Sequence, residues 1–163
     1  MNFSKLLLAV LLLAAAPVIA ADKTAEPVYA VAEYDPRRDP EVDLKLAVKL
    51  AAGNRRILLI AGSNSCGWCR SLSKEFKANP EVSRTLSESY VIMKINYDEK
   101  NGNLFFLQDY PDIRETPHFF VLDATGKLLH SRHSKSLEGA FSYRTKAMLQ
   151  FLKEWVPKKG GAK

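Results

Sequence analysis

The sequence predicts an α/β fold in which helices flank a central mixed β-sheet. Apolar runs typical of buried strands alternate along the chain with segments whose apolar residues recur at helical spacing. Near the C-terminal end, the turn-forming residues 123–127 separate two short apolar runs, which indicates an antiparallel hairpin. A chain of 163 residues is long enough for one domain with a hydrophobic core and too short for two ordinary ones. Helices and strands that alternate in this way require a sheet covered on both faces.

Residues 1–21 have the composition of a secretory signal peptide. Lys5 precedes an apolar run that begins at Leu6, and small residues follow this run up to Ala21. The run is short for a membrane span, so we favour cleavage after Ala20 or Ala21 over an uncleaved N-terminal anchor. The expected location of the mature protein is the periplasm or the extracellular medium.

The segment that follows, 22–40, is rich in prolines with charged residues between them. This composition predicts a loosely held lead-in, with a short strand at 28–32. The expected organisation is therefore a signal peptide at 1–21, a lead-in at 22–40, one folded domain at 41–157 and a flexible basic tail at 158–163.

The domain is predicted to alternate helices and strands. Its expected elements are a helix at 41–52, a strand at 57–61, helices at 66–78 and 80–90, a strand at 91–95, a helix at 101–110, strands at 118–122 and 128–130, and a helix at 143–155. Gly53 marks the end of the first helix, and Asn79-Pro80 ends the helix before it and caps the next. The uninterrupted apolar run 57–61 is typical of a central strand buried on both faces.

The net charge of the chain does not indicate nucleic-acid binding. Lys and Arg total 24 against 18 Asp and Glu, which gives a formal charge of +6. Apart from the tail, the excess is spread along the sequence, and aromatic residues are not interleaved with it as they are in nucleic-acid platforms. We interpret the charge as a contribution to solubility.

The chain contains two cysteines, Cys66 and Cys69, at the start of the predicted helix 66–78. A disulfide framework needs more cysteines at wider spacing, and a bridge that closes so small a loop stabilises little. At a helix N-terminus, free N–H groups and the helix dipole favour a thiolate, so Cys66 is the predicted nucleophile. Cys69, one turn further along, is predicted to resolve the mixed disulfide.

Three other interpretations of the cysteine pair are an inert pair of core thiols, a structural bridge and half of a metal site. A closed zinc site needs two further ligands, and the available histidines are His118, His130 and His133. A Cys-x-x-Cys pair beside alternating strands and helices favours redox chemistry. We therefore expect no metal and no dissociable cofactor.

Three local features resemble the thioredoxin superfamily, in particular its exported thioredoxin-like branch, which has Trp before the second cysteine. They are the strand 57–61 leading into Ser-Cys-Gly-Trp-Cys-Arg at 65–70, the segment Val-Ile-Met-Lys-Ile-Asn-Tyr-Asp at 91–98, and Ile-Arg-Glu-Thr-Pro at 113–117 before an apolar strand. The resemblance implies a thioredoxin-like fold with a cis Thr116–Pro117 bond facing the cysteines. An extended substrate segment would then be bound beside Cys66 by main-chain hydrogen bonds.

The sequence also departs from this superfamily. Cytoplasmic thioredoxins have a buried Asp in the strand before the cysteines, and its position corresponds to Ile60 here, while Lys94 matches the lysine that partners this Asp. The Gly-Trp pair between the cysteines differs from that of the reductases and of the strong oxidants. We expect Trp68 to be an exposed substrate contact and Gly67 to permit close approach of a partner. The segment 131–143 is a candidate loop bordering the site.

The predicted function is that of an exported thiol-disulfide oxidoreductase of the reductase or isomerase type. Its expected partners are thiols and disulfides of other exported proteins. A further expected partner is an upstream redox protein, either membrane-bound or soluble. A monomer is expected, because the chain has no room for a separate dimerisation domain. Two alternatives stay open: a thioredoxin-fold binding or chaperone module without redox turnover, and a copper-handling protein that uses the cysteines and a histidine.

Overall fold

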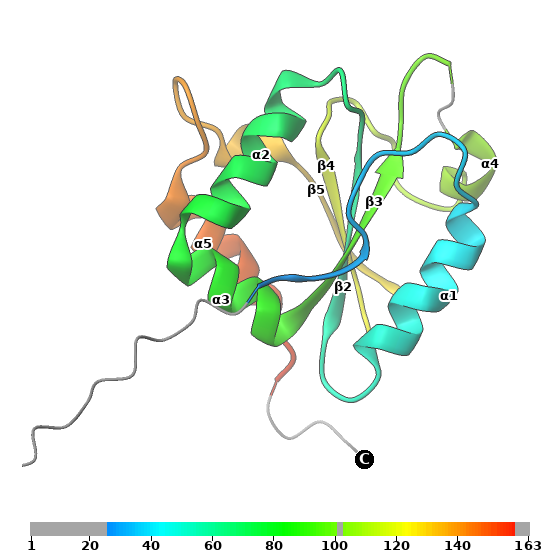
Figure 1. Ribbon diagram of the computed structural model, residues 1–163, viewed down its shortest axis with the longest axis horizontal. Coiled ribbons are helices and arrows are strands. Elements are labelled where there is room, and N and C mark those ends of the chain that lie inside the picture. The colour runs from blue at the N-terminus through cyan, green and yellow to red at the C-terminus, as the bar shows by residue number, and fades with distance from the viewer. Residues whose placement is uncertain (1–25, 101–102, 159–163) are drawn as a thin grey trace, which may run out of the picture.

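The computed structural model describes residues 26–100 and 103–158, so the predicted signal peptide and all but the first residue of the predicted tail lie outside the described residues. The elements (Figure 1) are β1 Val28–Val31, α1 Pro40–Ala51, β2 Arg56–Gly62, α2 Gly67–Ala78, α3 Pro80–Ser89, β3 Tyr90–Asn96, α4 Leu104–Leu107, β4 His118–Leu122, β5 Leu128–His133, the 3-10 helix η1 Ser134–Leu137 and α5 Thr145–Trp155. Within the described part, no helix is both long enough and apolar enough to cross a membrane.

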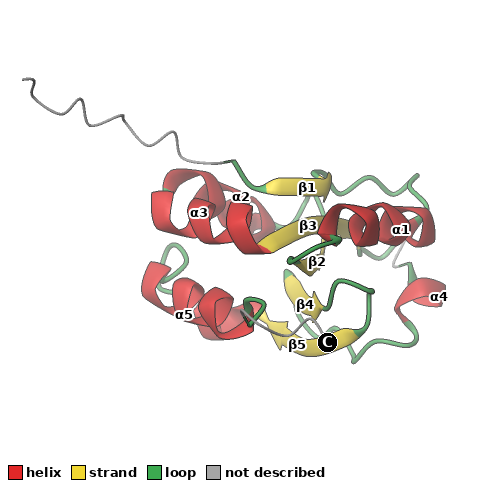
Figure 2. Ribbon diagram, turned by 90° about the horizontal axis from the view of Figure 1, so that it is seen from below, coloured by secondary structure: helices red, strands yellow, loops and turns green. Residues whose placement is uncertain are grey.

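The strands form one five-stranded mixed sheet in the order β1-β3-β2-β4-β5. β3 pairs in parallel with β1 and β2, whereas β4 pairs antiparallel with β2 and β5. Figure 2 shows α2, α3 and α5 on one face of the sheet and α1 and α4 on the other. The predicted fold class, a central mixed sheet flanked by helices, is confirmed.

The central strand β2 supplies both cores of the protein. Because successive side chains of a strand point to opposite faces, Leu58 and Ile60 enter the core beneath α2, α3 and α5, whereas Leu59 and Ala61 enter the core beneath α1. All of these side chains are fully buried. This two-sided burial explains why residues 57–61 read as an uninterrupted apolar run.

Two elements differ in length from the sequence prediction by more than two residues. Of the helix expected at 101–110, residues 101 and 102 lie outside the described residues. Among the others a single turn, Leu104–Leu107, is helical, because Asn103 has a left-handed backbone (φ 48°) and Pro111 restricts the residue before it. The second strand of the hairpin, expected at 128–130, continues to His133, since it stays paired with β4 along its whole length.

The lead-in is ordered from its first strand onward, contrary to the expectation of a loosely held segment. β1 extends the sheet by pairing with β3, and Tyr34, which follows it, is only 3% exposed. Asp39 then caps α1 by accepting hydrogen bonds from the N–H groups of Glu41 and Val42, with Pro40 at the first helical position. The segment before α1 is therefore part of the domain.

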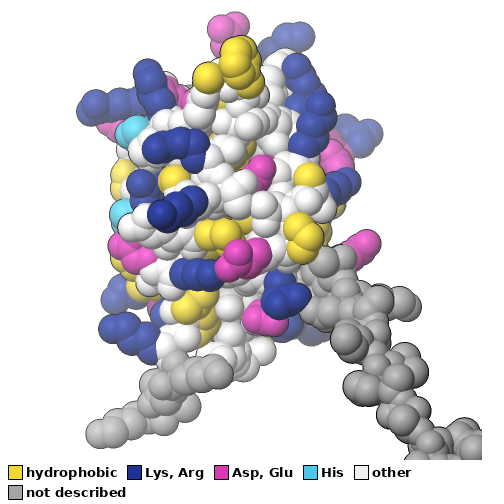
Figure 3. Space-filling view, turned by 90° about the vertical axis from the view of Figure 1, so that its left-hand side faces the viewer, with side chains coloured by type: hydrophobic (Ala, Val, Ile, Leu, Met, Phe, Trp, Pro, Cys, Tyr) yellow, Lys and Arg dark blue, Asp and Glu magenta, His cyan; other side chains and the backbone are white. Residues whose placement is uncertain are grey.

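Charged side chains are dispersed over the surface. Figure 3 shows Lys and Arg side chains spread over one face of the molecule, with Asp and Glu between them. Several of these charges are paired, for example Lys153 with Glu81 and Lys135 with Glu115. Exposed pairs of this kind contribute little to stability, and they are consistent with a solvated face.

Candidate active site around the Cys66–Cys69 disulfide

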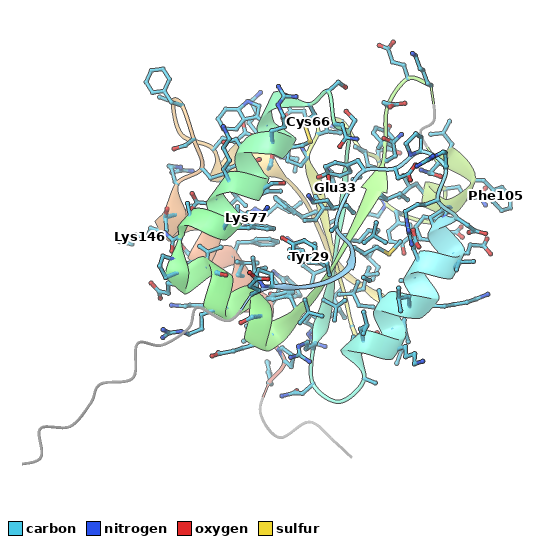
Figure 4. All side chains as sticks on the ribbon, in the orientation of Figure 1. Tyr29, Glu33, Cys66, Lys77, Phe105 and Lys146 are labelled. Carbon is cyan, nitrogen blue, oxygen red and sulfur yellow. A yellow bond between two sulfur atoms is a disulfide. The ribbon has the colours of Figure 1, made fainter. Side chains whose placement is uncertain are left out.

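The two cysteines lie where β2 ends and α2 begins. Figure 4 shows Cys66 at the upper end of the sheet. Between the two elements, the Cys66 N–H donates to the Ser63 carbonyl oxygen at 3.3 Å. Cys66 is the N-cap residue of α2, and its Sγ accepts a hydrogen bond from the N–H of Cys69 at 3.0 Å. The helix N-terminus therefore directs the backbone N–H of Cys69 at the first sulfur, as the sequence predicted.

Cys66 and Cys69 form a disulfide whose two sulfurs differ in exposure. Cys66 is half-buried, whereas Cys69 is only 1% exposed and belongs to the core between the sheet and α2. A reacting molecule in solution therefore meets the Cys66 sulfur first. The Cys69 sulfur can react only with a partner already held at Cys66.

Thr116 and Pro117 lie directly beside the first sulfur, although they are some fifty residues away in the sequence. The Sγ of Cys66 is 3.6 Å from both the carbonyl oxygen and the hydroxyl oxygen of Thr116. The Thr116–Pro117 peptide bond is cis, and Pro117 is buried. The antiparallel pairing of β2 with β4 places His118 opposite Ala61. Thr116 and Pro117, which precede His118, therefore lie next to the cysteines that follow β2.

Trp68 packs against the loop that joins η1 to α5. Its ring meets that of Tyr143 edge-on at a centroid distance of 5.5 Å, and the Tyr143 hydroxyl donates to the Trp68 carbonyl oxygen at 3.4 Å. As a result Trp68 is half-buried rather than fully exposed. The same loop, closed by a hydrogen bond from the Gly139 N–H to the Ser142 carbonyl oxygen, carries Phe141, which is 96% exposed.

Lys94 lies behind the disulfide and is 7% exposed. It is paired in register with Ile60, so the β2 side chain at this point offers no carboxylate. Its Nζ instead donates to the Ser73 hydroxyl at 3.1 Å and lies 5.2 Å from the centroid of the Tyr34 ring. Burial lowers the pKa of Lys94, and the carboxylate of Glu33 opposes this shift.

A cavity of about 280 Å³ is lined by both Cys69 and the N-terminal segment. Its walls include Cys69, Tyr34, Glu33, Ser73 and Lys94. In Figure 4, Tyr29 and Glu33 lie in front of the sheet beside α2, the helix that carries Lys77. The backbone joins the two regions as well, because the Asn64 side-chain amide donates to the Tyr34 carbonyl oxygen at 3.0 Å.

Sequence reasoning alone did not identify Tyr34, Glu33 or Phe141 as part of the site. The signal for the first two was the predicted strand at 28–32, since a strand added beside β3 carries the following residues towards the cysteines. The candidate loop at 131–143 does border the site through Tyr143, although its first half is strand and 3-10 helix.

His118 follows Pro117 and is buried on the face of the sheet opposite α2. Its Nε2 lies 2.8 Å from the Ser131 hydroxyl, and its ring packs on Phe120 at a centroid distance of 4.6 Å. Burial, followed by the charge of His133, lowers the pKa of His118 to about 4. Within residues 26–100 and 103–158, no group of three or more His, Cys, Asp or Glu side chains is placed to hold a metal ion.

Comparisons with known proteins agree with this fold. The sequence model of the thioredoxin-like domain matches residues 43–135. A disulphide isomerase from Xylella fastidiosa Temecula1 superposes with a TM-score of 0.64 at 24% identity, covering 74% of this chain and 94% of that one. The thioredoxin Deadhead from Drosophila melanogaster superposes with a TM-score of 0.51 at 19% identity, covering 71% and 94%.

A curated relative is similar over a shorter stretch. Human spermatogenesis-associated protein 20 is 36% identical over 47 residues, which are 29% of this chain and 6% of that protein. The chain therefore corresponds to a small part of that relative. The match of the domain model to more than half of the sequence, together with the mixed sheet and the disulfide at the start of α2, shows that this chain belongs to the thioredoxin-like domain family.

Proposed function

We propose that this protein is an exported thiol-disulfide oxidoreductase that exchanges disulfides with other exported proteins. One observation carries the proposal: the half-exposed sulfur of Cys66 lies at the N-terminus of α2 and against Thr116, with the buried sulfur of Cys69 bonded to it from behind. An attacking thiol and a resolving thiol need these two different environments.

In the first step, the Cys66 thiolate attacks one sulfur of a substrate disulfide. A bond forms between the Cys66 Sγ and that sulfur, and the second substrate sulfur leaves with the electron pair of the broken bond. The N–H of Cys69, which already donates to the Cys66 Sγ, stabilises the negative charge together with the end of the helix.

In the second step, Cys69 loses its proton and attacks the Cys66 sulfur. The Cys66–Cys69 bond forms, the bond between Cys66 and the substrate breaks, and the substrate sulfur leaves as a thiolate that takes up a proton. The substrate gains two electrons and the protein loses two. An upstream redox protein, membrane-bound or soluble, has to reduce the disulfide before the next cycle.

Substrate binding is assigned to Trp68, Thr116 and Pro117. Thr116 lies within 3.6 Å of the reacting sulfur, so an extended segment laid along its backbone would present a disulfide to Cys66. Main-chain pairing of this kind has little sequence selectivity, which suits a protein that acts on several partners. We favour reduction or isomerisation over oxidation as the reaction. Thr before the proline and the similarity to the Xylella disulphide isomerase support this choice.

The test combines turnover with the equilibrium reduction potential. We expect the reduced protein to accelerate insulin reduction, and the cysteine pair to have a potential closer to about −270 mV than to about −120 mV in a glutathione series read by alkylation and mass. Absence of insulin turnover combined with rapid oxidation of a reduced substrate would make the protein a disulfide donor instead. Failure to form the bridge would contradict the redox function and favour a binding module.

Export is tested separately. We expect the secreted or periplasmic protein, analysed by intact mass, to begin at Ala21 or Asp22, as the small residues at the end of the apolar run imply. Size-exclusion chromatography with light scattering is expected to give the mass of a monomer. Recovery of the protein in the membrane fraction with residues 1–21 still attached would show that this segment is an uncleaved anchor.

A further inference from the structure

We propose that the hydroxyl of Tyr34 donates a hydrogen bond to the Cys69 sulfur once the disulfide is opened, and that the adjoining cavity is the proton route of this buried thiol. The inference rests on the proposed function and deepens it, because it assigns the control of the resolving step to a residue of the N-terminal segment. Tyr34 lies outside residues 43–135, the part of the chain that the domain model matches.

Gly62 brings the two groups together. A Cβ added to Gly62 would lie 2.6 Å from the Cys69 Sγ and 3.0 Å from both the Cζ and the hydroxyl oxygen of Tyr34. The sulfur and the phenol end of the tyrosine therefore border one small space, which stays open because glycine has no side chain. Both side chains are almost completely buried, Cys69 at 1% and Tyr34 at 3% exposure.

The Tyr34 hydroxyl is buried, and among the described residues no protein group forms a hydrogen bond with it. Such an arrangement is unfavourable and calls for an explanation. In the disulfide form the neighbouring sulfur is a weak acceptor, whereas a Cys69 thiolate is a strong one. Burial also raises the pKa of Tyr34, so the hydroxyl keeps its proton and can donate it to a hydrogen bond.

The cavity of about 280 Å³ connects this pair to charged groups and to solvent. Besides the anionic Glu33, its walls carry three cationic side chains, which are Arg70, Lys77 and Lys94. This excess of positive charge favours the thiolate of Cys69. Glu33 is exposed, so the cavity reaches the surface there and is large enough to admit water.

In the resolving step, the Cys69 S–H proton leaves through the cavity past Glu33, and the hydrogen bond from the Tyr34 hydroxyl stabilises the negative charge on the sulfur. The thiolate attacks the Cys66 Sγ, the Cys66–substrate bond breaks with its electron pair on the substrate sulfur, and that sulfur takes up a proton from solvent. The reaction needs no other oxidant or reductant, because the substrate disulfide accepts both electrons.

The variant Tyr34→Phe removes only the hydroxyl. We expect the equilibrium constant with glutathione to shift roughly tenfold towards the disulfide form, which corresponds to a potential more negative by about 30 mV. Release of substrate from the mixed disulfide is expected to slow several-fold. The matched control is Tyr90→Phe, since Tyr90 is equally buried but its hydroxyl donates to the Leu152 carbonyl oxygen at 2.6 Å, and this variant should leave the equilibrium constant unchanged.

Unfolding of the two redox forms distinguishes this role from a structural one. Tyr34→Phe should destabilise the reduced protein and leave the oxidised protein unchanged or more stable, whereas Tyr90→Phe should destabilise both forms equally. In the wild-type protein, the ¹³Cζ resonance of Tyr34 should shift on reduction while that of Tyr90 does not, a measurement that needs no variant.

An equilibrium constant within twofold of wild type, an equal loss of stability in both redox forms, or an unshifted Tyr34 resonance would each overturn the inference. Insulin turnover and bridge formation by the wild-type protein are measured first. If they fail, the proposed function itself is wrong. If they succeed and Tyr34→Phe behaves like wild type, the thiol exchange stands and only the assignment of Tyr34 is wrong.

Discussion

The outer and inner sides of the disulfide are built from different parts of the chain. On the outer side, the Cys66 sulfur meets Thr116, and Trp68 follows in the first turn of α2; Thr116 and Trp68 are both partly open to solvent. On the inner side, the Cys69 sulfur faces the buried Tyr34 and a cavity lined by one anionic and three cationic side chains. The outer side is thus shaped to receive another chain. The inner side is shaped to control the charge of a sulfur that no substrate contacts directly.

The strongest test of this division replaces each cysteine in turn. Cys66→Ser should lower insulin turnover by roughly a thousandfold or more, because it removes the attacking sulfur. Cys69→Ser should keep the attack but lose the resolving step, so the protein accumulates as a mixed disulfide with its substrate. Intact mass under non-reducing conditions measures the adduct.

The opposite pattern would reverse the assignment. A stable adduct on Cys66→Ser and none on Cys69→Ser would mean that the buried sulfur attacks first, which requires the N-terminal segment to open. Wild-type protein alkylated at both cysteines is the control for non-covalent binding of substrate.

The outer side of the site could be predicted from the sequence, whereas the inner side could not. Cys66 follows a buried strand after the turn 63–65, so its place at a helix N-terminus follows from short-range pattern and spacing. The position of Tyr34 depends instead on the pairing of β1 with β3, more than fifty residues apart, which no local pattern specifies. Sequence reasoning identified the missing acid at Ile60 but had no means to find that Tyr34 lies beside the Cys69 sulfur.

The same limit applied to the fold. The buried strands and the long amphipathic helices were predicted correctly, because their apolar spacing is local and repeated. Residues 103 and 108–110 were over-predicted as helix, since the left-handed backbone of Asn103 leaves no mark in the spacing of apolar residues. Irregular segments around the site are set by long-range contacts.

Gly62 and Gly67 provide a matched pair of variants for the two sides. At Gly62 an added Cβ would meet the buried Cys69 Sγ at 2.6 Å, so Gly62→Ala should lower the free energy of unfolding by up to about 3 kcal/mol. At Gly67 the nearest atom, a guanidinium nitrogen of Arg70, lies 3.8 Å away. Gly67→Ala should therefore leave stability unchanged or slightly raised, because Ala favours the helix. Urea denaturation of the oxidised proteins measures both.

Equal stability of the two variants would contradict the close packing of the inner side. A second readout concerns the outer side, where Gly67 is expected to permit close approach of a partner. Gly67→Ala should then slow turnover of a protein substrate without slowing reduction of the protein by a small thiol.

His118 follows Pro117 in the chain, and its burial makes the stability of the folded protein depend on pH in the acid range. Its pKa is about 4 in the folded protein and about 6.5 in an unfolded chain, so below pH 6.5 the unfolded state binds the proton more tightly. The stabilisation is complete above pH 6.5 and is lost as the pH falls towards 4. We expect a loss of about 2 kcal/mol between pH 7 and pH 5 that His118→Gln removes. The difference in urea midpoints between the two proteins, compared at both pH values, measures it, and a constant difference would contradict the buried neutral imidazole.

The smallest expected effect concerns Phe141, which is exposed on the loop whose Tyr143 packs on Trp68. Its side chain is 96% exposed, and the loop that carries it is fixed to Trp68 through Tyr143, so it can add apolar contact to a bound protein without changing the chemistry at Cys66. Phe141→Ala should raise the KM for a protein substrate roughly three- to fivefold, about 1 kcal/mol, and leave kcat and reduction by a small thiol unchanged. Phe105→Ala is the matched control, because Phe105 is 78% exposed but lies on α4, on the far side of the sheet from α2 (Figures 2 and 4). Equal effects of the two variants would mean that the loop takes no part in recognition, and that the outer side ends at Trp68 and Thr116.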